Sequence, residues 1–560
     1  MIIDNNDSRS QTGNHKTEAP TLIQTRQGAS VLYKDKYLYS KYDPSKSILN
    51  IISNIEIPEY SIILIFSPVL WHGLKELLEK LPETSFIAAF EYDSQLYDLA
   101  LKNIPEELQP FFNSKIKIYN SKNISEYYDS IQKQHYRKQL KIDFSAGSVF
   151  FKAEYDSITI LTQRIIDQFW KNRLTLIKFG RLYSKNIFKN LRLLPHSIPL
   201  QKIYKTIDRP LIVLGAGESL NETIVGLKEC QNSFFIIAVD AAANPLLENG
   251  IMPDAIIAVE GQQAIEKAYI GKPSDSKILL IMDLVSRNHI PYITNGKTSF
   301  FISEYASMNF MERLNGLGLL PPVIPPLGSV GLAAMEIALH LRADETIPVF
   351  FSGLDFSYSP GITHAKETPA HKNILISNSK LKSLFNFASA FGQGNFPVQS
   401  KNSTVMYSSK VLEAYGLLFT EQFSDKKNIF DLGTTGIDLK TTRTDFKTVI
   451  ESIQQYPSKT GISIDNDVTI EKAVKDFLTE EKNQLEILKS LFTNGDASEH
   501  RMEQLTLKEQ IDSILKCREY LYIHFPDASG PTNQQSFYNR IRIELDFFLK
   551  EIQLVLDAQF

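Results

Sequence analysis

Short apolar runs separated by amphipathic stretches fill the middle of the chain. Such runs are typical of strands buried on both faces of a parallel sheet, and helical spacing of apolar residues lies between several of them. Their order predicts a doubly wound, Rossmann-like sheet over residues 206–430, with ligands at the carboxyl ends of its strands. The predicted strands are 211–214, 235–239, 255–259, 278–282, 300–302 and 349–352.

The segment before this block has a weaker α/β pattern of its own. Residues 62–66 and 86–90 are apolar runs on either side of a helical pattern, which is typical of a small parallel sheet. We therefore predict a smaller α/β domain over residues 21–205, which ends in a helical linker over 156–193. Residues 1–20 are polar and are predicted to form a disordered tail.

The segment after the central block is helical in pattern and rich in charge. Leucine and isoleucine recur there at intervals of three and four residues, which predicts a C-terminal helical bundle over 431–560. The predicted fold class is therefore α/β, with a central Rossmann-like domain, a smaller N-terminal α/β domain and a C-terminal helical domain. A length of 560 residues fits three domains.

Charge and cysteine content narrow the class of protein. The net charge of −4 argues against a nucleic-acid partner bound mainly through its phosphates. Cys230 and Cys517 are far apart, so free thiols in a reducing compartment are expected. No run of about 18 apolar residues indicates a transmembrane helix, and the polar N-terminal residues are not followed by the apolar stretch of a secretory signal. We therefore expect a cytoplasmic protein without a membrane partner.

A glycine-rich turn follows the first central strand. Gly215, Gly217, Glu218 and Ser219 lie between residues 211–214 and a predicted helix. A turn of this kind presents backbone N–H groups beside the positive end of a helix, where phosphate binds well. These four residues are therefore predicted to bind a nucleotide. The alternative is a tight turn in an ordinary α/β domain, because no third glycine completes the dinucleotide-binding pattern.

Polar residues also follow other predicted strands and make further candidates for the site. Asp240 and Asn244 are placed to contact a base or ribose, although Asp240 could equally cap a helix. Glu260 follows the next strand and is predicted to point into a cleft. Gly328 and Ser329 open an apolar helix and are predicted to bind an anion, with simple helix capping as the alternative.

The last cluster has the strongest catalytic character. Gly353, Asp355, Tyr358 and His364 lie within twelve residues after a strand end, and packing alone does not explain that combination. We predict His364 as the general base or acid, with Asp355 and Tyr358 nearby.

In the N-terminal domain, by contrast, the turn after residues 62–66 has no glycine. Glu91 could still contact a ribose there, but we predict a structural domain.

The candidate metal ligands are few. Glu260 and Asp283 could form a two-carboxylate Mg²⁺ site, but they are not closely spaced in the sequence. The sequence contains no phosphate-binding Gly-x-x-x-x-Gly-Lys-Ser/Thr loop and no cysteine–histidine zinc spacing. We therefore predict no metal site and no cofactor, and Mg²⁺ only for a phosphotransfer alternative.

Several of these motifs, in this order, resemble the motility-associated factor (Maf) glycosyltransferases, which modify flagellin in bacteria. The N-terminal region contributes one matching motif, and the helical C-terminal part also fits the family. The matching segments are 39–44, 214–220, 249–254, 328–331 and 353–365.

The central block also has a glycine-rich turn that ends in Ser-Leu at 219–220, a helix that ends in Ile-Ala-Leu at 337–339 and a strand that closes with Ser-Gly-x-Asp-Phe at 352–356. In these features it is similar to bacterial sialyltransferases, and the block as a whole is similar to the MptE-like domain of hydroxymethylpterin pyrophosphokinases. The sialyltransferase resemblance implies a CMP-activated nonulosonic acid (pseudaminic, legionaminic or sialic-like) as donor. It further implies that Gly217 and Ser219 hold the nucleotide, that Asn244 and Ser329 line the donor pocket, and that Tyr358 contacts the departing phosphate.

One departure concerns the catalytic base. Sialyltransferases have their base in a later loop, where this chain reads Gln-Ser-Lys-Asn over 399–402. His364 is then the expected base, with Asp355 and Glu260 as further catalytic candidates. The expected reaction is transfer of the sugar to Ser or Thr of flagellin, which flagellar assembly and motility require. The alternatives are a Mg²⁺-dependent pterin- or thiamine-type pyrophosphokinase and a non-catalytic flagellin-binding protein.

Overall fold

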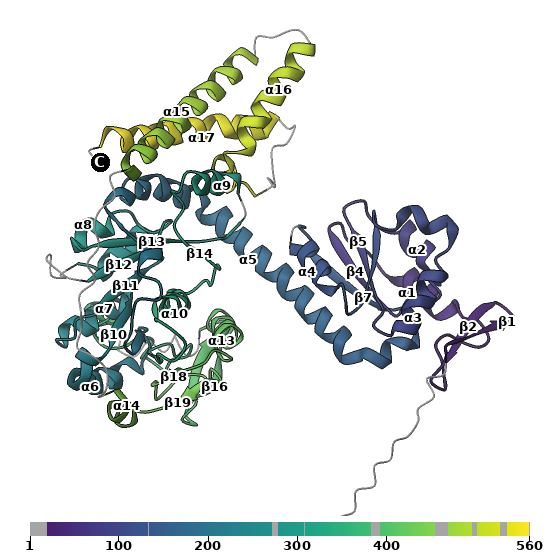
Figure 1. Cartoon of the computed structure of the whole chain (residues 1–560), viewed down its shortest axis with the longest axis horizontal. Helices are drawn as coiled ribbons and strands as arrows, with labels where there is room; N and C mark the ends of the chain where they lie inside the picture. The colour runs from purple at the N-terminus through teal and green to yellow at the C-terminus, as the bar shows by residue number, and fades with distance from the viewer. Residues whose placement is uncertain are drawn as a thin grey trace, which may run out of the picture. The chain divides into compact units, whose positions relative to one another are not determined.

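The computed structural model forms two compact units, residues 1–174 and 175–560 (Figure 1). The helix α5 (Lys152–Leu191) contributes to both hydrophobic cores: Ile158 packs in the first unit, and Phe188 packs in the second. The predicted disordered tail falls almost wholly on residues 1–18, outside the described part. The structure describes residues 19–132, 134–270, 278–306, 308–381, 392–453, 469–495, 501–526 and 535–558.

The first unit contains the predicted small parallel sheet. Its strand order is β6-β5-β4-β7, so β4 lies between strands that come later in the chain on both sides. The predicted strands at 62–66 and 86–90 are confirmed as β4 and β5. A separate antiparallel sheet of β1, β2 and β3 precedes it. The bounds are β1 Thr21–Thr25, β2 Gly28–Tyr33, β3 Lys36–Tyr37, α1 Lys46–Asn54, β4 Ser61–Phe66, α2 Leu74–Glu79, β5 Phe86–Phe90, α3 Ser94–Lys102, β6 Ile116–Tyr119, α4 Ile124–Gln132 and β7 Lys138–Asp143.

Glu91, the candidate ribose ligand of this unit, is enclosed by protein. Its side chain is 1% exposed, and its carboxylate accepts hydrogen bonds from the Ser67 hydroxyl at 2.6 Å and from the Asp93 N–H at 3.0 Å. The Tyr155 hydroxyl donates to it at 3.3 Å. Burial raises the pKa of Glu91 to about 7 from its ordinary 4.5. The carboxylate therefore belongs to the interior of the unit and does not face a ligand.

This burial makes the stability of the first unit depend on pH. Because the folded pKa of Glu91 lies above the unfolded one, its stabilising contribution is complete below about pH 4.5 and is lost as the pH rises through about 7. The Glu91→Gln variant should therefore gain roughly 3 kcal/mol of unfolding free energy relative to wild type between pH 4.5 and pH 8. Fluorescence of Trp71 and Trp170, the chain's two tryptophans, reports unfolding of this unit. If the difference in unfolding free energy between Glu91→Gln and wild type does not change with pH, the raised pKa assigned to Glu91 is wrong.

The second unit is built on a long parallel sheet. The strand order is β14-β13-β12-β11-β10-β9-β15-β18-β19, and β8 pairs with β13. All these pairings are parallel, and the six predicted strands are confirmed within one or two residues at either end. The bounds are β8 Ile198–Pro199, β9 Leu211–Leu214, β10 Phe235–Val239, β11 Ala255–Ala258, β12 Leu279–Asp283, β13 Thr298–Ser303, β14 Val323–Ile324, β15 Val349–Ser352, β18 Ile429–Asp431 and β19 Thr442–Arg443.

The strand order contains one reversal, between β9 and β15. From β9 the chain runs outward through β10 to β14, and then returns to place β15 on the other side of β9, in register from Leu211↔Val349 to Ser352↔Leu214. In doubly wound sheets, ligands bind at the carboxyl ends of the strands at such a reversal. The connecting helices are α6 Leu220–Cys230, α7 Asp240–Glu248, α8 Ile290–Thr294, α9 Asn309–Gly316 and α10 Val330–Leu341.

The remaining elements extend the unit past the predicted boundary at residue 430, which falls inside β18. A hairpin of β16 (Asn395–Gln399) and β17 (Val405–Ser409) lies between β15 and β18 in the sequence. The predicted C-terminal helices are present, but they share one hydrophobic core with the sheet. These further helices are α11 Pro369–Ile376, α13 Lys410–Phe423, α14 Phe446–Ile453, α15 Thr469–Gly495, α16 Arg501–Lys516 and α17 Gln535–Asp557.

A buried ionic cluster ties the C-terminal helices to the sheet region. Glu481 of α15 has no exposed side-chain surface and pairs with Arg313 of α9 and with Arg518, while the Tyr520 hydroxyl donates to it at 2.9 Å. Cys230 and Cys517 are both free, as predicted. Among the described helices, none is both long enough and apolar enough to span a bilayer.

Candidate functional site

The glycine-rich turn after β9 packs directly against the loop after β15. The Gly215 N–H donates to the Ser352 carbonyl and the Gly217 N–H donates to the Gly353 carbonyl, both at 2.8 Å. A Cβ added at Gly215 would lie 2.3 Å from the Gly353 oxygen, and one at Gly217 would lie 2.5 Å from Asp355 Oδ2. These glycines are therefore required for two backbones to approach each other at the reversal of strand order.

A single added methyl group should test this close approach. The Gly215→Ala variant should destabilise the second unit by about 1–3 kcal/mol or more, because neither backbone can move away without breaking the strand pairing. The matched control is Gly316→Ala in α9, where nothing lies within 4 Å of the added Cβ; it should be neutral or slightly stabilising. Thermal unfolding followed by circular dichroism compares the two. Equal melting temperatures would contradict the packing argument.

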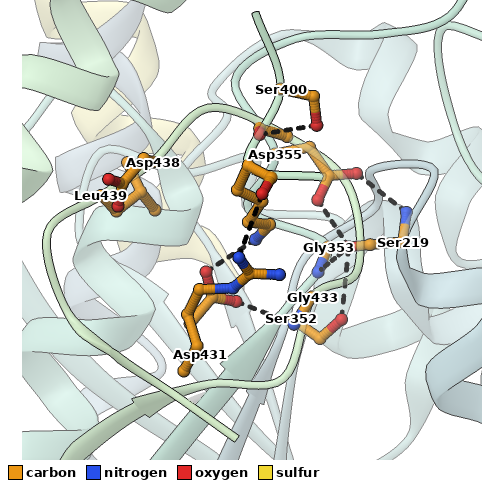
Figure 2. A network of polar contacts seen from close by, with 12 residues as sticks. Ser219, Ser352, Gly353, Asp355, Ser400, Asp431, Gly433, Asp438 and Leu439 are labelled. Carbon is orange, nitrogen blue, oxygen red and sulfur yellow. Dashed lines mark hydrogen bonds and ion pairs between the residues drawn. The ribbon is translucent and has the colours of Figure 1, made fainter. Parts of the chain in front are cut away.

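Asp355 and Ser219 fasten the two loops together (Figure 2). One carboxylate oxygen of Asp355 accepts from the Ser219 N–H at 2.8 Å, and the other accepts from the Ser219 hydroxyl. The Ser219 hydroxyl in turn accepts from the Gly353 N–H at 2.9 Å. Asp355 is 3% exposed and Ser219 is 2% exposed. Asp355, which is predicted to be catalytic, and Ser219, which is predicted to contact the nucleotide, are thus both buried and hydrogen-bonded to each other.

This packing changes which backbone groups of the turn are available to a ligand. The N–H groups of Gly215, Gly217 and Ser219 all donate to the chain itself. Within the described residues, no protein atom accepts from the N–H groups of Ala216 and Glu218, which alternate with them. Any anion bound at the turn would therefore be held by these two N–H groups, and not by those of the glycines.

Glu218 also helps to position the second loop. Its Oε2 accepts from the Ser359 N–H at 3.1 Å, which links the turn after β9 to the segment that carries Tyr358. The predicted ligand role of the Glu218 side chain thus competes with an internal hydrogen bond.

A third glycine-containing loop, which follows β18, joins this network and was missed in the sequence. Lys401, from the hairpin loop, forms a 2.6 Å ion pair with Asp431, and both side chains are 3% exposed. A Cβ added at Gly433 would lie 2.9 Å from the Lys401 Nζ and 3.1 Å from the Ser219 Oγ. The Ser400 hydroxyl and the Lys401 N–H both donate to the Gly436 carbonyl. The pattern of an apolar strand followed by Gly433 and Gly436 could have revealed this loop.

The two buried carboxylates, Asp355 and Asp431, share the buried ammonium group of Lys401, and the exposed Arg443 adds a second positive charge near Asp431 only. Burial raises the pKa of Asp355 to about 6, and the pKa of Asp431 is also raised by burial, against the lowering effect of Lys401. Lys401 therefore limits the electrostatic cost of both carboxylates under the glycine-rich turn.

His364 lies on a loop that docks against the same turn. The N–H of the next residue, Ala365, donates to the Ala216 carbonyl at 2.9 Å, and the Lys366 N–H donates to Asn221 Oδ1 at 2.9 Å. The His364 side chain is exposed, and its Nδ1 is 3.1 Å from the Thr363 Oγ1. Desolvation of the ring by the surrounding protein lowers the pKa of His364 below its ordinary 6.5. At neutral pH the imidazole is therefore uncharged and able to accept a proton.

The predicted partnership of His364 with Asp355 is not formed. Both carboxylate oxygens of Asp355 are bonded to Ser219. Tyr358 is buried and its backbone pairs with Tyr407 in both directions at 2.9 Å, so its position is set by the β17 hairpin. Burial raises the pKa of Tyr358, which keeps its hydroxyl protonated at neutral pH.

Ser329 lies at the N-cap of α10, as the sequence predicts. Its side chain makes no capping hydrogen bond, so the capping alternative is wrong and the hydroxyl is not used by the helix. Gly328 before it has a φ of 69°, in the left-handed region that favours glycine. A Cβ at Gly331 would lie 2.4 Å from Leu354, which shows how closely the start of α10 approaches the loop after β15.

Asp240, Asn244 and Glu260 lie further along the same edge, after β10 and β11. Asp240 is the first residue of α7, and its carboxylate accepts from the Ala241 N–H at 2.7 Å. Asn244 is half-buried within α7. Glu260 is half-buried, and its carboxylate accepts from the Gln262 N–H at 3.0 Å. The structure therefore places these residues one and two strands away from the turn after β9.

Asp283, the second candidate metal ligand, is enclosed. It is 1% exposed and accepts from the Val285 N–H at 3.1 Å and the Ser303 N–H at 3.2 Å, and burial raises its pKa to about 6. In the described ranges, no three His, Cys, Asp or Glu side chains gather into a group that could hold a metal ion.

Comparisons with known proteins match this chain at three levels. Residues 183–361 match the family model described as 6-hydroxymethylpterin diphosphokinase MptE-like. An uncharacterized protein of Treponema pallidum (strain Nichols) is 31% identical over 555 residues, which cover 95% of this chain and 94% of that protein. A second uncharacterized protein of the same organism is 28% identical over 113 residues, 20% of this chain and 53% of that protein.

A solved structure has the same fold. It is described as the structure of a MAf glycosyltransferase from Magnetospirillum magneticum AMB-1. It superposes with a TM-score of 0.52 at 13% sequence identity, and the match covers 97% of this chain and 93% of that one.

Proposed function

We propose a glycosyltransferase function for this chain, which belongs to the same family as the full-length Treponema pallidum relative and has the fold of a Maf glycosyltransferase. The observation that carries the proposal is the junction of three glycine-containing loops at the reversal between β9 and β15, with His364 on a loop docked against it. Activated sugars carry an anionic nucleotide, and a preformed edge with unused N–H groups suits that group.

The proposed donor is a CMP-activated nonulosonic acid, and the proposed acceptor is a Ser or Thr hydroxyl of flagellin in the cytoplasm, in support of flagellar assembly and motility. The resemblance to the Maf family over 214–220 and 353–365, and the resemblance to sialyltransferases at 219–220, 337–339 and 352–356, support this choice. No metal enters the proposed reaction.

In the proposed chemistry, one set of groups stabilises the departing phosphate and another group takes the proton of the acceptor. The N–H groups of Ala216 and Glu218, the start of α10 at Ser329 and the Tyr358 hydroxyl would stabilise the charge that develops on the departing phosphate. The bond between the anomeric carbon and the phosphate oxygen breaks, and the acceptor oxygen bonds to the same carbon. His364 takes the proton of the acceptor hydroxyl, and CMP leaves as the anion.

The test is a transfer assay with the purified chain. Release of CMP from a CMP-activated nonulosonic acid, together with the mass of intact flagellin, measures donor cleavage and acceptor modification separately. We expect flagellin to gain the mass of the sugar in amounts equal to the CMP released. Absence of both signals across the sialic, legionaminic and pseudaminic donors would overturn the proposal.

The MptE-like match favours a second candidate, a Mg²⁺-dependent pyrophosphokinase. That activity predicts AMP release from ATP with a hydroxymethylpterin substrate, which the same purified chain can be assayed for. A non-catalytic flagellin-binding protein would bind flagellin but show no heat of donor binding in calorimetry.

A further inference from the structure

A cavity of about 190 Å³ in the second unit takes no part in the chemistry proposed above. It lies at the carboxyl ends of β12 and β13, and the C-terminal half of α5 and the helix α9 form its sides. Its lining is mainly apolar and includes Ile187, Val285, Met308, Met311, Leu320 and Val323.

The walls of this cavity are held in place by buried polar contacts. Asp283 accepts from the N–H groups of Val285 and Ser303, and so joins the loops that follow β12 and β13. The Asn186 side chain of α5 donates to the Val285 carbonyl at 2.9 Å. The cavity is therefore formed before any ligand arrives, as is usual for binding sites.

The size and chemistry of the lining indicate the kind of group that fits. A dry apolar cavity of about 150 Å³ is enough to hold a benzene molecule, so this one has room for one aromatic or branched side chain. Met308 and Met311 are flexible and polarizable, which suits side chains of varied shape. An apolar side chain is thus a better occupant than a charged nucleotide.

The rim of the cavity is acidic. Glu304 and Glu312 both line it and are exposed, and neither forms an ion pair with any described residue. Two unpaired carboxylates at the mouth of an apolar cavity favour a partner that carries lysine or arginine beside its apolar residue.

The cavity shares the edge of the sheet with the candidate active site. β13 is four strands from β9, so the two sites are roughly 19 Å apart at the usual spacing between strands. An extended peptide covers that distance in about six residues. A polypeptide lying along the carboxyl ends of the strands could therefore occupy both sites.

We infer that this cavity docks an apolar side chain of the protein acceptor, in a segment that also carries basic residues, about six residues from the modified hydroxyl. The inference rests on the proposed function for the identity of the partner. Docking of such a peptide can be measured without any transfer.

The first experiment measures binding in the full chain. Methyl-¹³C-methionine labelling gives eight resonances, and Met308→Leu and Met311→Leu assign two of them. The probe is a synthetic peptide with one leucine flanked by lysines, and the control peptide has serine in place of leucine. We expect the Met308 and Met311 signals to shift saturably with the leucine peptide, and binding to weaken by about tenfold with the serine peptide. Shifts at other methionines only would overturn the inference.

Three variants complete the test. Met311→Trp narrows the cavity and should weaken binding of the leucine peptide about tenfold, as loss of one buried apolar side chain does. Leu317→Trp is the matched control, because Leu317 ends the same helix, is 53% exposed and does not line the cavity. The double variant Glu304→Gln/Glu312→Gln should remove most of the salt dependence of binding.

The transfer assay then separates the two proposals. If wild type shows no transfer with any donor but binds the peptide at this cavity, the proposed function fails and the docking site stands. If wild type modifies flagellin and Met311→Trp does so as fast as Leu317→Trp, the docking site fails and the proposed function stands. We expect Met311→Trp to lose about tenfold in kcat/KM for flagellin.

Discussion

The His364→Ala variant should lose about a hundredfold or more of the rate of sugar transfer to flagellin, which is the usual contribution of one general base. The physical reason is that an uncharged imidazole at the surface of the docked loop can accept the acceptor's proton at neutral pH, and alanine cannot. Donor binding, measured by calorimetry, should change little, because the N–H groups that would hold the phosphate are on another segment. The rate is measured as CMP release with flagellin present.

The matched control is His196→Ala, which removes an exposed histidine after α5 in the same unit and should keep the wild-type rate. Added imidazole should restore part of the activity of His364→Ala. If His364→Ala keeps near-full transfer while Glu260→Gln loses transfer, the base is Glu260, the other candidate at the carboxyl ends of the strands.

The Lys401→Met variant should destabilise the second unit by about 3–5 kcal/mol, because it leaves the Asp431 carboxylate buried without its ion-pair partner. Asp355, whose pKa burial already raises to about 6, would lose the same neighbouring positive charge. Ser219, in the turn after β9, donates two hydrogen bonds to Asp355. Local opening around Asp355 should therefore extend to that turn. Hydrogen exchange measured by mass spectrometry should show faster exchange over 215–219, 351–356 and 429–436.

Two further variants show whether the effect comes from the unpaired charge. The double variant Lys401→Met/Asp431→Leu removes both charges and should be clearly more stable than Lys401→Met alone. Lys410→Ala breaks an exposed pair with Glu413 and should cost at most about 0.5 kcal/mol. Equal losses for Lys401→Met and the double variant would show that packing, and not charge, is responsible.

Strand positions were the most predictable part of this chain. Leu211–Leu214, Phe235–Val239 and Val349–Ser352 lie where the apolar runs predicted them, because strands buried on both faces leave an uninterrupted apolar signal. The short strand Ile429–Asp431 was missed, and the predicted domain end at 430 cut through it. Three residues are too few to produce a periodic signal.

The candidate site was only partly predictable, for a related reason. Glycine followed by a polar residue at a strand end identified the turn at Gly215 and the loop at Gly353. The sequence could not show that these two loops bond to each other, with Asp355 holding Ser219 across 136 positions. For the same reason the sequence did not reveal the ion pair of Lys401 with Asp431. It showed Lys401 only as part of the loop over 399–402, where sialyltransferases have their catalytic base.

The sequence by itself determined the six apolar strands of the central sheet and the set of strand ends at which polar and glycine residues collect, since each of these depends on neighbours a few positions away. Only the tertiary structure decided which of those residues support the site and which are open to a ligand. Hydrogen-bond partners, burial and pKa depend on groups brought close from distant parts of the chain, and a carboxylate such as Asp355 or Glu91 is the same in sequence whether it faces solvent or lies inside.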